Sequence, residues 1–268
     1  MRANPDIFFQ NGYGVLFKKY RWISPLIIKK WQILFVSVLT PRNSKQLRIL
    51  DVGAGIGRFS LPLAMLPLPV KPIVFAVDRS VEMLSVLKTE SHNMGLSNIS
   101  CIESDVLEYD AHESFDFIFL SDVLPFLMPL KDAFYHFYSL LCDGGLICIR
   151  ARSHDALAQI EWLHDFQGLL ELDRARVPDI NDLAEMLTCC GFGNIMSYEI
   201  DETESVSCDL YVKMLEERSF SILHCIPDKD FENGLISVRK RLINQSLTFQ
   251  TSISTALIAK KETSNDTI

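Results

Sequence analysis

The sequence predicts an α/β protein with a mostly parallel sheet and helices on both faces. Between residues 46 and 200, short apolar segments typical of buried strands alternate with segments of helical periodicity. The first of these strands runs into a glycine-rich loop, and acidic side chains accompany the ends of three strands. Since the carboxyl ends of parallel strands share one edge of a sheet, the pattern places a ligand site at that edge.

The glycine loop is the strongest local signal in the chain. Residues 48–52 form an apolar strand that carries Asp51, and Gly53, Gly55 and Gly57 follow at alternate positions before a helix. Glycine lets the backbone turn sharply and lets a ligand approach where a Cβ would clash, and a helix start adds free N–H groups. The G-x-G-x-G spacing differs from the dinucleotide fingerprint G-x-G-x-x-G.

The next two strands also lead to acids. Residues 72–77 form a second strand that ends at Asp78, whose carboxylate can accept hydrogen bonds from both hydroxyls of a ribose. The alternative role for Asp78 is the N-cap of the next helix, although Ser80 could serve that purpose. A third strand over 98–103 is followed by Asp105.

The remaining elements complete the alternating pattern. A fourth strand over 115–120 leads to Ser121 and Asp122, and a helix ending near Leu140 meets a Gly144-Gly145 turn before a fifth strand. Later segments read as helices over 155–172 and 179–190, and as strands over 194–200 and 250–260.

Two segments lie outside this core. Residues 5–40 read as two amphipathic helices, with Pro41–Ser44 as a loop behind them. We favour packing of this pair on the sheet, and a lid over the ligand is compatible with it. Residues 204–245, which include a helix over 232–242, form an insert before the last strand that we expect to cover a site.

Composition narrows the function classes. The 268 residues are 48% apolar and carry a net charge of −8, which disfavours general nucleic-acid binding. The first 50 residues carry nine basic side chains and one acid. Seven scattered cysteines without metal-ligand spacing indicate reduced thiols, no metal and a cytoplasmic location. No secretory signal or uninterrupted membrane span is evident, so no integral membrane contact is expected.

The run Asp51-Val-Gly-Ala-Gly-Ile-Gly57 resembles the first motif of class I S-adenosylmethionine (SAM)-dependent methyltransferases. The resemblance covers roughly residues 46–200 and implies a Rossmann-like, seven-stranded sheet with an antiparallel last strand. It implies that Asp105 takes the adenine amino group, that Val106 covers the ring and that Arg58 can pair with the SAM carboxylate. The expected cofactor residues are Asp51, Gly53, Ala54, Gly55, Gly57, Arg58, Asp78, Arg79, Asp105, Val106 and Ser121.

The corresponding division of the chain has four parts. They are an N-terminal helical lid over 1–45, a SAM-binding core over 46–203, a helical insert over 204–245, and the last strand with the tail over 246–268. The insert and the aromatic N-terminal helices predict a small, partly apolar metabolite as the methyl acceptor. The sequence specifies neither the methylated atom nor an oligomeric state.

Methyl transfer is a displacement in which the protein mainly aligns the acceptor and excludes water. A general base is needed only for an acceptor that is protonated at rest. The candidates for such a base are His154, Asp122, His224 and Tyr211, each of which could instead be a packed or surface residue.

Other functions fit the sequence less well. A nicotinamide dehydrogenase would explain Asp78 but neither Asp105 nor the glycine spacing. Protein N-terminal methyltransferases share the Gly-Ala-Gly-Ile-Gly-Arg run but lack a long insert, and the basic, aromatic N-terminus suits a lipid or quinone acceptor. A non-catalytic SAM-binding module is the alternative from outside the enzymes.

Overall fold

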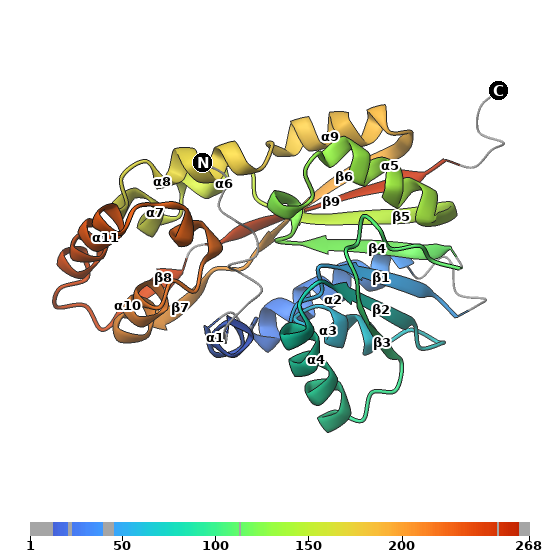
Figure 1. The fold of residues 1–268 in the computed structure, drawn as a ribbon, viewed down its shortest axis with the longest axis horizontal. Helices are drawn as coiled ribbons and strands as arrows, with labels where there is room; N and C mark the ends of the chain where they lie inside the picture. The colour runs from blue at the N-terminus through green and yellow to red at the C-terminus, as the bar shows by residue number, and fades with distance from the viewer. Residues whose placement is uncertain (1–12, 21–22, 40–45, 113, 251, 263–268) are drawn as a thin grey trace.

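A seven-stranded sheet forms the centre of the protein (Figure 1). The computed structural model describes residues 13–20, 23–39, 46–112, 114–250 and 252–262. In spatial order, the strands are β3 (Ile99–Glu103), β2 (Ile73–Asp78), β1 (Arg48–Val52), β4 (Phe115–Ser121), β5 (Leu141–Ala151), β9 (Ile253–Lys261) and β6 (Phe192–Asp201).

The direction of the strands confirms the predicted fold class. Strands β1, β2, β3, β4 and β5 pair in parallel, whereas β9 is antiparallel to both of its neighbours, β5 and β6. The last strand in the chain is therefore the antiparallel one. This Rossmann-like order brings the carboxyl ends of β3, β2, β1 and β4 together at one edge, where a ligand can bind.

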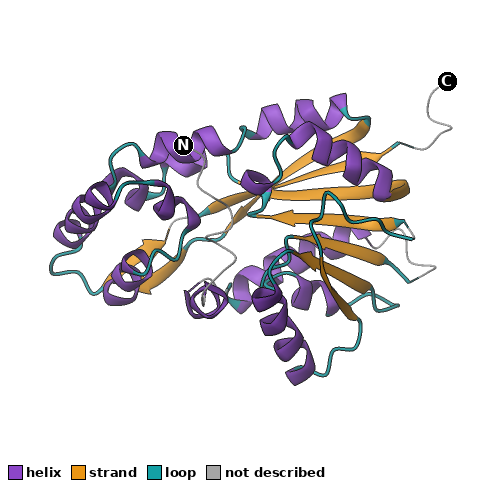
Figure 2. Cartoon of the chain, viewed as in Figure 1, coloured by secondary structure: helices purple, strands orange, loops and turns teal. Residues whose placement is uncertain are grey.

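One face of the sheet is covered by α2 (Pro25–Leu39), α3 (Ser60–Ala64) and α4 (Val81–Asn93) (Figure 2). Trp31 and Phe35 of α2 are fully buried against Phe117 and Phe119 of β4. Aromatic pairs of this kind add stability beyond their buried area. The second predicted N-terminal helix thus packs on the sheet, as the amphipathic pattern indicates.

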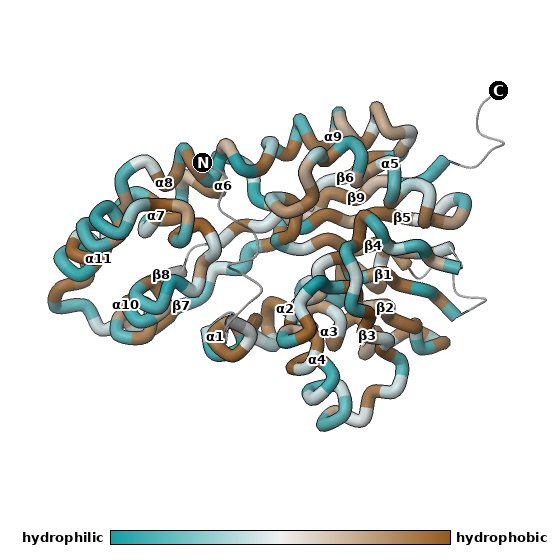
Figure 3. Tube along the Cα trace, viewed as in Figure 1, coloured by the Kyte–Doolittle hydropathy of each residue, from teal (hydrophilic) through white to brown (hydrophobic). Residues whose placement is uncertain are grey.

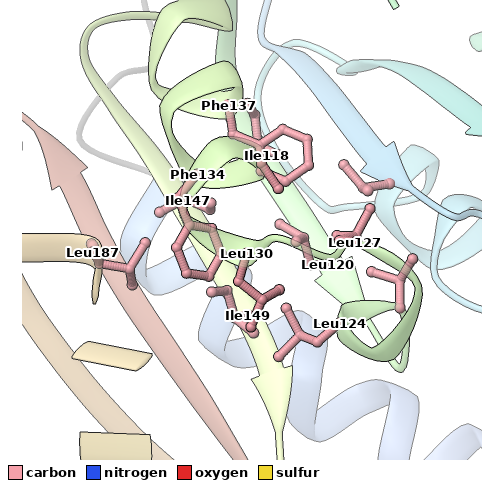
Figure 4. Packing of buried hydrophobic residues seen from close by; sticks show 14 of the residues in the cluster. Ile118, Leu120, Leu124, Leu127, Leu130, Phe134, Phe137, Ile147, Ile149 and Leu187 are labelled. Atoms are coloured by element: carbon pink, nitrogen blue, oxygen red, sulfur yellow. The ribbon is translucent and has the colours of Figure 1, made fainter. Parts of the chain in front are cut away.

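The other face is covered by α5 (Leu130–Leu140) and α9 (Ile180–Cys189). Leu130, Phe134 and Phe137 lie at helical spacing on α5 and meet the apolar side chains of β4 and β5 (Figure 4). Figure 3 shows the same arrangement as a band of hydrophobic chain along the sheet. The strands are apolar on both faces because helices cover both.

Two local predictions were wrong. The helix expected over 155–172 is divided into α6 (His154–Ala158), α7 (Glu161–Asp165) and α8 (Leu169–Arg176), with Gly168 at φ 70° between the last two. The Gly144-Gly145 pair lies within β5 as an irregularity, because the pairing with β4 moves from Phe115–Leu141 to Phe117–Leu146. Gly144 has φ 70°, a conformation that glycine adopts easily, and this permits the irregular pairing between β4 and β5.

A second lobe stands beside the sheet, on the left in Figure 1. It contains α6, α7 and α8 together with α10 (Cys208–Glu216), η4 (Ser221–Cys225) and α11 (Asp228–Arg241), which share one hydrophobic cluster. Strands β7 (Glu204–Ser207) and β8 (Leu247–Gln250) pair beneath it. We call residues 154–176 and 204–250 the cover. The insert therefore packs with a segment that the sequence assigned to the core.

Helix α1 (Tyr13–Tyr20) lies between the core and the cover. The backbone N–H of Gly14 donates to Glu82 of α4, and the Tyr20 hydroxyl donates to Glu217 at the end of α10. The start of this helix expected near residue 5 and the loop expected at 41–44 lie outside the described residues. Among the described residues no single helix has the length and apolarity to cross a membrane, and only the sharply bent pair of α1 and α2 meets those criteria jointly.

Candidate functional site

A cavity of about 180 Å³ lies at the carboxyl edge of β3, β2, β1 and β4. Every residue predicted to bind the cofactor lines it except Gly57. Its wall also includes Phe17, Met83 and Phe126, which the sequence analysis did not assign to the site. Phe17 could be placed only in three dimensions, because its helix reaches the cavity from outside the core.

Gly53, Ala54 and Gly55 of the glycine loop line this cavity, which we call the first cavity. Gly55 has φ 55°, and a Cβ built there would meet no atom within 4 Å, so it would project into open space. Gly57, at φ 84°, has a different task, because a Cβ there would overlap Leu87 of α4. Gly55 thus keeps space for a ligand, whereas Gly57 allows the loop to pack closely on a helix.

Asp78 holds the loop in place from the end of β2. Its Oδ2 accepts the Gly55 N–H at 2.7 Å, and its Oδ1 accepts the Ser80 N–H at 2.8 Å. Burial raises the pKa of Asp78. Ser80 caps α4 by accepting from the Met83 N–H, which leaves Asp78 free of that role. Each carboxylate oxygen keeps a lone pair for a further donor in the cavity.

Asp51 is the most deeply buried acid of the cavity wall. Its side chain lies on the face that contacts α3, where the Ser60 hydroxyl donates to Oδ2 at 2.5 Å. Burial raises the pKa of Asp51 to about 7, against the opposing effect of the Ser60 hydrogen bond. A nearby cation would favour the ionised carboxylate, so this site is suited to a positively charged ligand.

Asp105 and Val106 form the wall beyond β3. Asp105 Oδ1 accepts the Leu107 N–H at 2.9 Å, and its Oδ2 lies 3.8 Å from Arg79 Nε. Val106 is 6% exposed and presents an apolar surface to the cavity. An acceptor oxygen beside an apolar side chain suits a flat ring that carries an amino group.

Asp122 follows β4 with φ 55°, a conformation that few non-glycine residues adopt. Its Oδ2 lies 2.8 Å from Arg150 Nη1 and 3.4 Å from Arg58 Nη1, and its Oδ1 lies 3.6 Å from Arg152 Nη1. Backbone strain of this kind often accompanies functional sites. With both oxygens engaged by guanidinium groups, Asp122 is better placed to position its neighbours than to accept a proton.

Arg150 is anchored from behind by a buried acid. Its Nε and Nη2 donate to the two oxygens of Glu202, and the Trp31 indole N–H also donates to Glu202 at 2.7 Å. Burial disfavours the Glu202 carboxylate, but the Arg150 ion pair and the hydrogen bonds outweigh it and hold its pKa at about 2. The network fixes Asp122 relative to the sheet.

A second cavity, of about 160 Å³, adjoins the first across Asp122 and Ser221, which line both. The cover contributes much of its apolar wall, including Leu157, Trp162 and Phe220. Arg150, Arg152, Arg176 and Asp173 supply its charged groups. None of these arginines was assigned to a site from the sequence, although Arg150 and Arg152 stand at alternate positions at the end of the fifth strand.

Three of the four proposed general bases, His154, His224 and Tyr211, lie outside both cavities, and each has other contacts. His154 Nε2 lies 3.1 Å from the Val177 carbonyl oxygen, and His224 Nε2 lies 2.8 Å from that of Arg218. Burial lowers the pKa of His224. Tyr211 is 2% exposed within the cover, where burial raises its pKa. The structure therefore brings only Asp122 to the site.

No group of three or more His, Cys, Asp or Glu side chains is arranged to hold a metal within the part of the chain that the structure describes. The seven cysteines are all free thiols. Burial raises the pKa of Cys148 and, to a smaller extent, of Cys101 and Cys190, which keeps these thiols in their unreactive form.

Comparison with known proteins agrees with this arrangement. A family model described as a methyltransferase domain matches residues 43–202. The ribosomal RNA small subunit methyltransferase G of Shewanella halifaxensis is 31% identical over 157 residues, which are 56% of this chain and 70% of that protein. The "Probable cobalt-precorrin-6B C(15)-methyltransferase (decarboxylating)" of Thermoplasma acidophilum is 27% identical over 121 residues, 45% of this chain and 54% of that protein.

Among solved structures, the fold is similar to phosphoethanolamine N-methyltransferase 2 of Haemonchus contortus in complex with SAM. The TM-score is 0.58 at 16% identity, and the match covers 98% of this chain and 60% of that one. The chain belongs to the methyltransferase-domain family, and it is a SAM-dependent methyltransferase.

The residues of the first cavity fit SAM as the methyl donor. The open space over Gly55 and the buried Asp51 carboxylate suit a bulky cationic ligand. When bound, SAM supplies a sulfonium-activated methyl group. The chain then has to orient the donor and the acceptor in line and exclude water. Phe17 and Asp122 both line this cavity.

Proposed function

We propose that this methyltransferase acts on a small, partly apolar metabolite that binds in the second cavity. The observation that carries the proposal is the position of that cavity, which meets the cofactor cavity at Asp122 and Ser221. A concave site with an apolar wall and a few polar groups is the usual form of a small-molecule site. Residues of the cover form one of its walls, whereas a long polymer would need an open groove.

The proposed cofactor contacts follow from the first cavity. Asp78 binds the ribose hydroxyls, Asp105 and Val106 contact the adenine ring, and Asp51 and Arg58 face the methionine part. Asp122 acts as a positioning residue through Arg58, Arg150 and Arg152. An acceptor whose nucleophilic atom is unprotonated at rest needs no base from the protein. Free thiols at all seven cysteines support a cytoplasmic location.

RNA is the second candidate acceptor, because one relative is named a ribosomal RNA methyltransferase. The net charge of −8 argues against it, since most RNA-binding surfaces are basic. The excess of basic residues in the first 50 positions is the feature that would favour it. The two acceptors can be distinguished directly.

The test supplies methyl-labelled SAM with a metabolite extract, ribosomal subunits, total RNA and denatured protein in separate reactions. We expect label in a low-molecular-weight product only. Label in RNA would overturn the small-molecule proposal and support the RNA acceptor, and label in protein would support an N-terminal methyltransferase. The Asp78→Asn variant is the control for label that does not come from this enzyme.

A further inference from the structure

The arginines of the second cavity differ in how far their N–H donors are used. Arg150 directs Nε and Nη2 to Glu202 and Nη1 to Asp122 and Ser121, and it is only 3% exposed, so it presents little surface to the cavity. Arg152 and Arg176 differ from it. Their nearest carboxylate oxygens, on Asp122 and Asp173, lie at 3.6 and 3.7 Å, beyond normal hydrogen-bond length.

The hydrogen bonds of these two side chains go to hydroxyl groups. Arg152 donates from Nε and Nη2 to Ser252 Oγ at 3.3 and 3.1 Å, and Arg176 donates from Nη2 to Ser221 Oγ at 3.4 Å. Because a guanidinium group has five N–H donors, these contacts leave donors on both side chains. Both side chains line the cavity and are only 22% and 18% exposed.

Three arginines and two aspartates line the second cavity, although the whole chain is acidic. Glu202 pairs with Arg150 from behind, so Asp122 and Asp173 are the acids nearest to Arg152 and Arg176. Arg152 and Arg176 line the same cavity, so a ligand bound there lies beside both. Partly buried N–H donors without a close acceptor are costly.

We propose that the methyl acceptor carries an anionic group, a carboxylate or a phosphate, which is bound by Arg152 and Arg176. This inference rests on the proposed function, since it takes the second cavity as the acceptor site. The planar guanidinium fork matches both anions and forms strong, charge-assisted hydrogen bonds with them. The apolar body of the acceptor lies against Leu157, Trp162 and Phe220. The acceptor is then a small amphipathic acid.

The test uses fragments that need no methyl transfer. Protein saturated with S-adenosylhomocysteine (SAH) is titrated with phenylacetate, phenyl phosphate and the neutral phenylacetamide, followed by ligand-observed NMR and calorimetry. We expect at least one anion to bind at least about tenfold tighter than the amide. Comparison of the two anions shows whether the site prefers a carboxylate or a phosphate. Equal affinity for the amide and both anions would overturn the proposal.

Variants assign the effect to the two arginines. Arg152→Gln and Arg176→Gln should each weaken binding of the preferred anion by about tenfold or more while leaving the affinities for the amide and SAH unchanged. Arg174→Gln is the matched control, because Arg174 lies on the same helix but donates to the His154 carbonyl oxygen instead of lining the cavity. Anion binding that is unaffected in both cavity variants would refute the assignment. If one variant fails to fold, which its SAH affinity reveals, the other decides.

The fragment-binding results and the labelling results can fail separately. An enzyme that binds the anion through Arg152 and Arg176 but labels only RNA or protein would refute the small-molecule function while leaving the anion site established. Labelling of a neutral metabolite, with no anion preference in the fragments, would refute the anion site and keep the proposed function.

Discussion

Single carboxylates of the cofactor cavity combine a structural task with a binding task. Asp78 connects the end of β2 to the Gly55 N–H and the start of α4, while its remaining lone pairs face the cavity. Asp51 is tied to Ser60 and still lines the same space. Each acid therefore stabilises the ligand-free loop in the conformation in which it receives a ligand. Preorganisation of this kind lowers the cost of binding.

Asp78→Asn should weaken SAM binding by more than about tenfold, because a charged acceptor for the ribose hydroxyls becomes a neutral amide. The amide keeps the shape of the side chain but has one acceptor oxygen, so it also loses one of the two backbone N–H contacts of Asp78, and the loss of affinity includes that contribution. Calorimetric titration with SAM measures the effect. Glu103→Gln is the matched control. Glu103 is the exposed partner of Asp78 on β3, and its substitution removes the same charge. Equal losses in the two variants would contradict a specific role for Asp78.

The pKa of Asp51, about 7 in the ligand-free protein, predicts a pH-dependent affinity. The sulfonium and ammonium groups of SAM favour the ionised carboxylate, so binding should release a proton near neutral pH and tighten from pH 6 to pH 8. Calorimetry in two buffers with different ionisation enthalpies measures the released proton. Asp51→Asn should remove both the release and the pH dependence. A proton release that persists in this variant would assign it to another group.

The raised pKa of Asp51 also means that the ligand-free protein becomes less stable as the pH rises, whereas its affinity for SAM increases. Because burial raises the pKa of Asp51 in the folded state, the folded state loses stability as the pH rises from about 4 through 7. Asp51→Asn should therefore unfold at a higher urea concentration than the parent protein at pH 8, and the advantage should shrink at pH 5. The buried Asp51 carboxylate thus lowers the stability of the ligand-free protein at neutral and higher pH, and it suits a cationic ligand.

Sequence reasoning reached the lining of the first cavity because it depends on strand ends and on a fixed loop. Asp51, Asp78 and Asp105 lie at or just after the ends of strands whose order the fold determines, and all three line the cavity. His154 was chosen by residue type and its place after the fifth strand, and His224 and Tyr211 by their place on the insert, but their surroundings depend on how the cover folds. A histidine that contacts a carbonyl oxygen and one that faces a substrate look alike in a sequence.

At the scale of elements, a buried network joins α2 to the sheet next to the site. Glu202, directly after β6, binds Arg150 of β5 and the Trp31 indole of α2. The burial of an ion pair costs solvation free energy, so its parts must remain matched. The α2 helix is therefore connected to the position of Asp122 through a chain of three side chains.

Glu202→Gln should destabilise the protein at pH 7 by roughly 3 kcal/mol, the lower end of the cost of breaking a buried ion pair. The depressed pKa of about 2 means that the stabilisation is complete above pH 4.5 and is lost as the pH falls from 4.5 towards 2. The difference from the parent should thus shrink by pH 3, as urea unfolding can measure. Glu199→Gln, on an exposed position of β6, is the control. A difference that is the same at both pH values would contradict the ion-pair account.

Elements inside the sheet were easier to predict than those of the cover. The strands alternate with helices in a fold whose connections are constrained, so their order follows from the pattern. The segment from 155 to 172 has helical periodicity throughout, but Gly168 and the contacts of Trp162 and Phe166 with the insert divide it. Those contacts come from residues more than 40 positions away, which periodicity does not register.

At the scale of the whole molecule, the site lies where three parts of the chain meet. The sheet edge lines the first cavity, the cover forms part of the wall of the second, and α1 contacts both lobes. Gly14 and Lys18 of α1 bind Glu82 and Glu90 of α4, while Lys19 and Tyr20 bind Glu217. Phe17 lies between these two sets of contacts and lines the first cavity. Helix α1 thus connects the core to the cover beside the first cavity, and we propose that it closes the cofactor site.

This arrangement predicts that contacts distant from the cofactor control its release. Glu217→Ala removes the acceptor of both the Tyr20 hydroxyl and Lys19 Nζ, so α1 should leave the cover more often and SAH should dissociate about threefold faster. Stopped-flow displacement of SAH measures the rate, and hydrogen exchange should increase in α1 alone. Glu216→Gln is the control, because Glu216 is the adjacent residue and pairs with Arg239 instead. Unchanged SAH dissociation in Glu217→Ala, with α1 exchanging faster, would show that α1 lies over the cavity without closing it.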